Sequence, residues 1–232
     1  MIKKLGFCRS LARILLRGAL RAPKRASAAG ACLGFAGGLG GWIAAGPPPE
    51  ASEAWGPGVR CERRVTDRPG EGPVVLQELA CTLRAEDVTG RVVIVPAFNY
   101  PAFRAGRRTS PIDGGNLNRA FPGRADGGVT EKIADYFQRT LVPMADVVLD
   151  FHAGGRTLDF VPLAAVHRLA DAAQQSRCEA AMHAFNAPYS MTMLELDAVG
   201  MFDTAVEAQG KVFVSTELGG GGTATARSIA IA

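Results

Sequence analysis

The feature that most constrains the fold is an alternation of short apolar runs with helical patterns between residues 71 and 232. Three runs rich in β-branched residues have the length of buried strands: RVVIVP at 91–96, DVVLDF at 146–151 and KVFVST at 211–216. Apolar residues at helical spacing predict helices over residues 71–83, 129–141 and 171–185. Strands that alternate with helices predict an α/β domain with a mainly parallel or mixed sheet flanked by helices.

Residues 1–70 differ in composition from the remainder of the chain. They hold 12 Lys and Arg against 4 Asp and Glu, whereas residues 71–232 hold 14 against 18. The stretch 46–69 is rich in Pro, Gly and Arg and has no period of 2 or 3.6, so it offers no face to bury. We therefore expect residues 1–70 to be disordered or translated out of frame, and we place the domain at residues 71–232.

Charge, hydropathy and cysteine usage limit the partners and the location. A nucleic-acid reader carries positive charge on its folded face, but here the basic excess lies in residues 1–70. The stretch GACLGFAGGLGGWIAAG is too glycine-rich for a membrane span of roughly 20 apolar residues. The five cysteines form no C-x-x-C pair, which favours reduced thiols. We expect no nucleic acid partner, no stable membrane anchor and a cytoplasmic location; the oligomeric state stays open.

Residues with catalytic potential stand at the carboxyl ends of two predicted strands, where ligands bind in open α/β sheets. In DFHAGG, Asp150 and His152 leave the strand on one side, so the carboxylate can orient an imidazole that binds metal. In STELGG, apolar surroundings would suit Glu217 to general acid/base work. The alternatives are a structural histidine and a helix-capping glutamate. His167 and His183 are expected to be structural or surface residues.

A third candidate is the loop RTSPIDGGNLNRAFPG, which carries Arg108, Asn118 and Arg119 among glycines and prolines. A guanidinium is a planar two-pronged donor that suits a carboxylate, so the loop is a candidate anion site. The alternative is a solvated basic loop, but Asn-Arg next to Phe-Pro-Gly favours a constrained one. Because loops at the strand ends meet, we expect Arg108 and Arg119 to converge with His152 and Glu217 in one cleft.

Four motifs, taken in order, resemble the succinylglutamate desuccinylase/aspartoacylase family of zinc-dependent amidohydrolases: R-x-S-P-x-D, N-L-N-R-x-F-P-G, D-x-H-x-G-G and T-E-L-G-G. The resemblance begins near residue 71 and runs to the end of the chain. It implies a zinc-carboxypeptidase-like fold and hydrolysis of the amide bond of a small N-acyl amino acid, by deacetylation or desuccinylation. The amino-acid sequence of these segments is most similar to that of a bacterial branch of the family.

The resemblance also implies a role for each candidate residue. His152 corresponds to a zinc ligand, and Glu217 to the general base and acid that acts on the zinc-bound water. Arg108 corresponds to the group that polarises the scissile carbonyl. Asn118 and Arg119 correspond to the pair that holds the substrate carboxylate.

The family has two further zinc ligands, in an H-x-x-E stretch just before E-G-P, since three protein ligands leave zinc one position for water. Counted back from Glu71, these places fall on Thr66 and Pro69, and neither residue supplies an imidazole or a carboxylate. The family's segment after the GGGG stretch is also missing from the sequence. We therefore expect a domain incomplete at both ends, with impaired activity. The alternative is a non-catalytic member that at most binds an amino-acid carboxylate.

Overall fold

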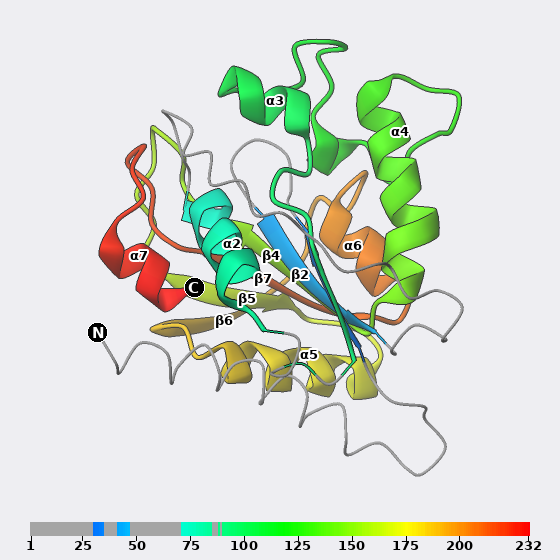
Figure 1. Ribbon diagram of the computed structural model, residues 1–232. Helices are drawn as coiled ribbons and strands as arrows, with labels where there is room; N and C mark the ends of the chain where they lie inside the picture. The colour runs from blue at the N-terminus through cyan, green and yellow to red at the C-terminus, as the bar shows by residue number, and fades with distance from the viewer. Residues whose placement is uncertain (1–29, 35–40, 47–70, 85–87, 89) are drawn as a thin grey trace.

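The computed structural model describes residues 30–34, 41–46, 71–84, 88 and 90–232 (Figure 1). Within them, one seven-stranded sheet has the order β1-β2-β4-β7-β5-β6, with β3 paired to β2. The strands are β1 Gly30–Gly34, β2 Gly41–Gly46, β3 Arg91–Ile94, β4 Val147–His152, β5 Leu163–His167, β6 Tyr189–Met193 and β7 Val212–Glu217. The α-helices are α2 Glu71–Thr82, α3 Tyr100–Ala105, α4 Val129–Tyr136, α5 Ala172–Phe185, α6 Phe202–Glu207 and α7 Ala226–Ile231.

The sheet is mixed, which is one of the two forms that the sequence predicted. β4 pairs with β7 in parallel, and β5 pairs with β6 in parallel. β7 and β5 run antiparallel, as do β2 and β4. The carboxyl ends of β4 and β7 therefore lie at one end of the sheet, and those of β5 and β6 lie toward the other.

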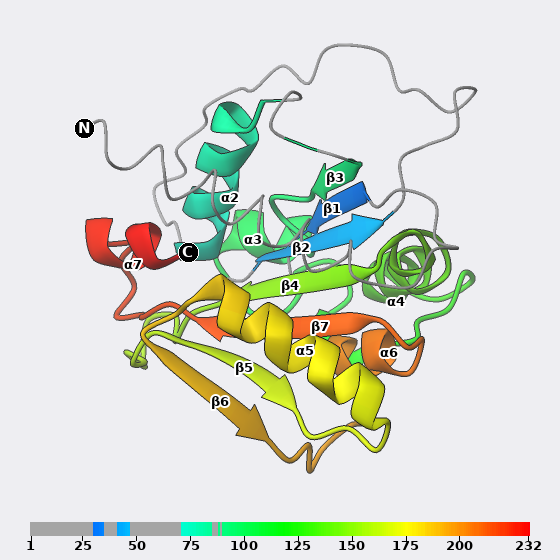
Figure 2. The same cartoon turned by 90° about the horizontal axis from the view of Figure 1, so that it is seen from below.

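Helices cover both faces of the sheet. α5 packs on β5 and β7, below the sheet in the view of Figure 1, whereas α4 and α6 lie above it. Figure 2 shows α5 crossing in front of β7 and β5. α5 begins after Asp171, whose carboxylate accepts the N–H groups of Ala173 and Gln174, and it ends at Asn186 in the left-handed conformation. Local capping thus defines both ends of the helix predicted over residues 171–185.

An aromatic cluster joins α6 to the sheet and to the loops above it. The fully buried ring of Phe202 lies 4.8 Å from Phe121, 5.0 Å from Phe98 and 5.8 Å from Phe213, measured between ring centroids. Phe137 packs on the same cluster, 4.0 Å from Phe98. Tilted and edge-to-face contacts at these distances stabilise a core beyond simple burial. The cluster fixes the loop around residue 121 against the start of α6.

Two predicted elements differ from the structure, and β6 has no predicted counterpart. The run 91–96, expected to be buried on both faces, forms β3, whose residues are half-buried because the strand pairs with β2 beside the main path of the sheet. The helix predicted over 129–141 is α-helical to Tyr136 and π-helical from Phe137 to Leu141. β6 was not predicted because four of its five residues are exposed and no apolar run marks it.

Two strands come from the region that the sequence analysis set apart. β1 and β2 pair with each other, and β2 also pairs with β3 and, through Gly41 and Trp42, with β4. The expectation that residues 1–70 do not pack with the domain therefore does not hold for these two segments; the rest of the region lies outside the described residues. Strand pairing uses backbone hydrogen bonds, which need no hydrophobic period, so the pattern gave no signal.

Cys81 and Cys178 differ in their bonding state. Cys81 is disulfide-bonded, so the expectation of reduced thiols is wrong at this position, whereas Cys178 is a buried free thiol. In the part of the chain that the structure describes, no helix is long and apolar enough to cross a bilayer.

Replacing Phe202 by Ala should lower the free energy of unfolding by about 3–5 kcal/mol, because it leaves a cavity between α6 and the sheet. Tyr136→Ala, at a side chain that is 54% exposed, serves as the control and should cost less than about 1 kcal/mol. Urea denaturation followed by circular dichroism measures both. Equal losses in the two variants would show that the aromatic cluster does not hold α6.

Candidate active site

His152 and Glu217 end two neighbouring parallel strands. They are the last residues of β4 and β7 and are direct partners in the strand register. Paired residues on hydrogen-bonded strands lie about 4.8 Å apart and project from the same face of the sheet. The two side chains therefore leave the sheet side by side.

Asp150 orients the ring of His152. Its Oδ2 lies 2.7 Å from Nε2 of His152, and its carboxylate is buried. Burial alone would lower the pKa of His152, but the charges of Asp150 and Glu217 raise it to about 9. The hydrogen bond holds a proton on Nε2 and, in the neutral ring, leaves the lone pair on Nδ1. Asp150 thus orients the imidazole of His152, whose role as a metal ligand stays a prediction.

Glu217 stands in surroundings that suit proton transfer. Burial, with smaller contributions from the carboxylates of Asp150 and Glu71, raises the pKa of Glu217 to about 7. The charges of His152 and Arg108 act in the opposite direction and lower it. Oε2 of Glu217 is buried without a hydrogen-bond partner among the described residues. A carboxyl group with a pKa near 7 can both take up and release a proton at neutral pH.

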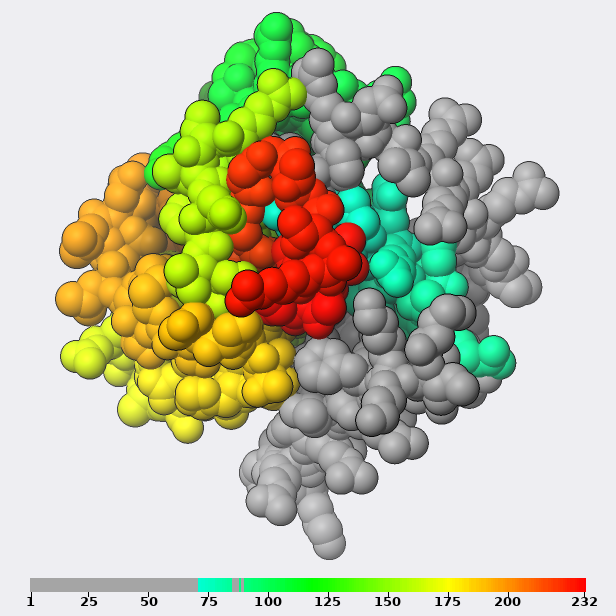
Figure 3. Space-filling model, turned by 90° about the vertical axis from the view of Figure 1, so that its left-hand side faces the viewer, coloured from blue at the N-terminus to red at the C-terminus, as the bar shows by residue number. Residues whose placement is uncertain are grey.

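The glycine-rich loops after β4 and β7 are hydrogen-bonded to each other. The N–H of Gly154 donates to the carbonyl of Gly219, and the N–H of Gly221 to that of Leu158, both at 2.9 Å. A Cβ at Gly154 would lie 2.4 Å from the Leu158 carbonyl oxygen, and a Cβ at Gly220 would lie 2.0 Å from it. Figure 3 shows the resulting arrangement, with the C-terminal segment between the loop after β4 and α2. These glycines serve the close approach of two backbones.

α2 contributes the carboxylate of its first residue, Glu71, which the sequence marked only as the start of a helix. Glu71 is 2% exposed, and a Cβ built on Gly219 would lie 3.2 Å from its carboxylate oxygen Oε1. Burial raises its pKa, and its charge acts on Glu217. The beginning of α2 therefore lies beside the loop after β7.

Arg108 lies in the loop after α3, and its side chain is exposed. Its charge lowers the pKa of Glu217. The loop is constrained: the N–H of Ser110 donates to the carbonyl of Gly115 at 2.9 Å, and the N–H of Gly114 donates to that of Ser110 at 2.8 Å. The alternative of an unconstrained basic loop therefore does not describe this segment.

Asn118 and Arg119 pack against the segment that leads into α6. Oδ1 of Asn118 accepts the N–H of Phe202 at 2.8 Å. Nη2 of Arg119 lies 3.3 Å from Oδ2 of Asp197, with both side chains partly exposed. The carbonyl of Arg119 is so close to Gly200 that a Cβ there would lie 2.6 Å from it. Sequence reasoning had not found Asp197 as the partner of Arg119.

The charge of Asp203 acts on the histidine at the end of β4. Asp203 follows Phe202 in α6, and its charge contributes to the raised pKa of His152. Of the four residues predicted to converge, His152 and Glu217 are thus adjacent, whereas Arg119 pairs with Asp197; a common cleft that includes Arg108 and Arg119 stays a prediction.

The described residues supply few metal ligands at the ends of β4 and β7. There, His152 is the residue that matches a zinc ligand of the family, and the places of the other two, Thr66 and Pro69, lie outside the described residues. A stable zinc site takes three or four protein ligands, so the described set alone does not fit the ion. The described group that could hold a metal lies elsewhere, at His167. His167 is buried, whereas His183 is exposed as expected.

Residues 70–232 match the family model of the succinylglutamate desuccinylase/aspartoacylase catalytic domain. The chain therefore belongs to the succinylglutamate desuccinylase/aspartoacylase family, as its motifs predicted. It is similar to N-alpha-acetyl-L-2,4-diaminobutyric acid deacetylase from Halomonas elongata, with 67% identity over 161 residues. That alignment covers 69% of this chain and 47% of the relative, so the chain spans about half of the relative's length. The similarity confirms the bacterial branch that the loop sequence SPIDGGNLNRAFPGR indicated.

Solved structures show the same fold. The product-bound ectoine utilization protein EutE (DoeB) from Ruegeria pomeroyi is 54% identical, with a TM-score of 0.67 over 91% of this chain and 66% of that protein. A succinylglutamate desuccinylase from Silicibacter sp. TM1040 is also 54% identical, with a TM-score of 0.68 over 91% and 65%. The fold predicted as zinc-carboxypeptidase-like is that of this family.

Asp113 anchors the loop that carries Arg108 and Asn118, so its removal should loosen that loop. Its carboxylate accepts the N–H of Thr130 at 2.7 Å and the Thr130 hydroxyl at 2.8 Å, at the start of α4. Burial works against the charged form, but the hydrogen bonds from Thr130 and Gly115 lower the pKa of Asp113 from 3.8 to about 2. Asp113→Ala should cost about 1 kcal/mol of stability at pH 5, as for a lost helix cap.

The loss of stability caused by Asp113→Ala should depend on pH. Because the folded pKa lies below the unfolded one, the contribution of Asp113 is complete above about pH 4 and is lost as the pH falls through about 2. Urea denaturation at pH 5, 3.5 and 2 should therefore show that the free energies of unfolding of the wild type and of Asp113→Ala converge as the pH falls. Asp126→Ala, at an exposed carboxylate, is the matched control. A difference in the free energy of unfolding between wild type and Asp113→Ala that stays constant down to pH 2 would contradict this account.

Proposed function

We propose that the ends of β4 and β7 form the catalytic centre of a zinc-dependent amidohydrolase that removes the N-acyl group from a small amino acid. The observation that carries the proposal is the pairing of Glu217, with a pKa of about 7, with His152 oriented by Asp150 on adjacent parallel strands. Membership of the family and the similarity to a deacetylase of N-alpha-acetyl-L-2,4-diaminobutyric acid support it.

Each residue has a defined task in this proposal. Glu217 takes a proton from the attacking water and passes it to the leaving amine, for which a pKa near 7 is suited. Arg108 donates hydrogen bonds to the scissile carbonyl, since its exposed guanidinium acts on the same end of the sheet as Glu217. His152 contributes one ligand to zinc, which would supply a Lewis acid for the water.

The substrate carboxylate is assigned to the loop at Asn118 and Arg119. Oδ1 of Asn118 is engaged by Phe202, so the amide nitrogen is the group left to donate to an anion. Asp197 holds Arg119 through an exposed ion pair, which a substrate carboxylate can share or displace at small cost. A small N-acyl amino acid with a free carboxylate fits this loop.

The activity of this chain depends on how many metal ligands it supplies. The sequence has Thr66 and Pro69 where the family has its remaining ligands, and one histidine does not retain zinc. We therefore assign impaired turnover to this chain. The second candidate is a non-catalytic member that binds an amino-acid carboxylate at Arg119, and the same ligand count favours it.

A chimera in which residues 71–232 replace the matching segment of the Halomonas elongata deacetylase should deacetylate N-acetyl-2,4-diaminobutyrate, because the relative supplies the remaining parts of the site. Glu217→Gln in the chimera should lower kcat by about 10²–10⁴-fold with the zinc content unchanged, because the change removes a proton shuttle and not a ligand. Glu78→Gln, on the exposed side of α2, is the matched control. A Glu217→Gln chimera with more than a tenth of the parent kcat would refute the role of Glu217.

The unchanged chain should show negligible deacetylation, and its zinc content should not change on His152→Ala, because a single ligand contributes little affinity. Elemental analysis after gel filtration and an amine-release assay measure both. Zinc that is lost on His152→Ala, together with turnover comparable to that of the Halomonas protein, would show that further ligands complete the centre.

A further inference from the structure

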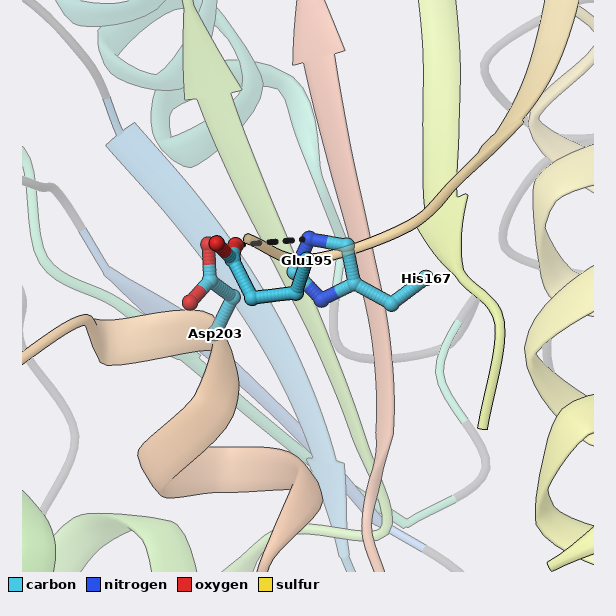
Figure 4. Close-up of side chains that lie close together, drawn as sticks. All are labelled: His167, Glu195 and Asp203. Carbon is cyan, nitrogen blue, oxygen red and sulfur yellow. Dashed lines mark ion pairs between the residues drawn. The ribbon is translucent and has the colours of Figure 1, made fainter. Parts of the chain in front are cut away.

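A second cluster of ligand-type side chains lies away from Glu217. His167 ends β5, which runs antiparallel to β7, so it lies toward the amino end of β7. Met193 is the register partner of His167, and Glu195 follows it by two residues. Asp203 is the second residue of α6. Figure 4 shows these three side chains pointing toward one another from a strand end, a loop and a helix.

The distances within the cluster suit a shared ion. Nε2 of His167 lies 3.3 Å from Oε2 of Glu195. One ligand atom from each of the three residues lies within 4.8 Å of the other two. Ligand atoms about 2.1 Å from a tetrahedral zinc ion are separated by about 3.4 Å, so rotation of the carboxylates closes the remaining gap.

Glu207 fixes the ring of His167. Its Oε2 lies 2.9 Å from Nδ1, and the residue stands one helical turn after Asp203 on α6. A carboxylate on one ring nitrogen orients the other nitrogen toward a metal in many metal-binding histidines. Nε2 is thereby aimed at Glu195.

The cluster carries more negative charge than its histidine can balance. Three carboxylates, those of Glu195, Asp203 and Glu207, surround one imidazole, and protonation of His167 would compensate only one of them. The Glu207 side chain is only 8% exposed, and its Oε1 is buried without a hydrogen-bond partner among the described residues. Buried carboxylates without compensation are costly, and a divalent cation supplies the missing charge.

We propose that His167, Glu195 and Asp203 form a binding site for a divalent first-row metal ion, with Glu207 as the carboxylate that orients the histidine. One imidazole nitrogen with carboxylate oxygens is a donor set that Zn²⁺ and its neighbours accept. The site uses none of the residues assigned to the zinc centre of the proposed function and does not depend on that proposal.

A bound ion would link three elements, of which α6 is already joined to the end of β5 by the hydrogen bond between Glu207 and His167. It would tie the segment 194–201 and α6 to the end of β5. That segment carries Asp197, the partner of Arg119. The ion would therefore order the segment against which the Asn118–Arg119 loop packs.

The test is metal binding by the full chain after removal of metal with a chelator. Titration with Zn²⁺ in a calorimeter should show one equivalent bound, and Co²⁺ should give an absorption spectrum of low-symmetry coordination. Glu195→Gln and Asp203→Asn should each weaken binding at least tenfold, and His167→Gln should abolish the Co²⁺ spectrum. The matched controls Glu78→Gln and His183→Gln, both at exposed positions, should bind as the wild type does.

Thermal melts separate a lost site from a lost fold. Zn²⁺ should raise the Tm of the wild type and of His152→Ala by mass action, and should leave that of Glu195→Gln unchanged. Glu195 lies in a loop and its side chain is 21% exposed, so its replacement keeps the test valid if His167→Gln fails to fold. Absence of binding below about 1 mM Zn²⁺, or wild-type binding by Glu195→Gln and Asp203→Asn, would overturn the proposal. Binding lost only on His152→Ala would also overturn it.

Discussion

The parallel pairing of β4 with β7 is the contact on which the candidate site depends. In this register His152 stands beside Glu217, and a slip of one residue would turn one of them to the opposite face. The register continues beyond the strands, because the N–H of Leu218 donates to the carbonyl of His152 and the glycine loops remain paired. The proximity of an oriented imidazole and a partly buried carboxyl group is thus a product of the strand register.

Strong apolar runs made the centre of the fold predictable. The runs at 146–151 and 211–216 became β4 and β7, and the helical patterns at 71–83 and 171–185 became α2 and α5. The exposed β6 carries no such run. The direction of a strand is also invisible to hydrophobic periodicity, so the reversal between β7 and β5 could not be foreseen.

In the candidate site, residues at the end of a recognisable strand were predictable, whereas their partners on other elements were not. Motifs located His152 and Glu217 because each is attached to the end of a recognisable buried strand. The partners that come from other elements had no such signal. Asp197 reaches Arg119 across 78 residues, and Glu195 meets His167 because β5 and β6 run side by side. Spacing along a chain reports on one element at a time, whereas these contacts follow from how elements pack.

The interlock between the Asn118–Arg119 loop and the start of α6 has a kinetic consequence. Its contacts join residues up to 84 positions apart, and contacts of such separation are closed late, after the intervening strands have assembled. The same contacts are few and partly exposed, so they belong to the part of a domain that opens locally at low free energy. Such an opening would leave the β4–β7 register intact. Hydrogen exchange in this loop would then proceed by local fluctuation, while the amides of β4 and β7 exchange only on global unfolding.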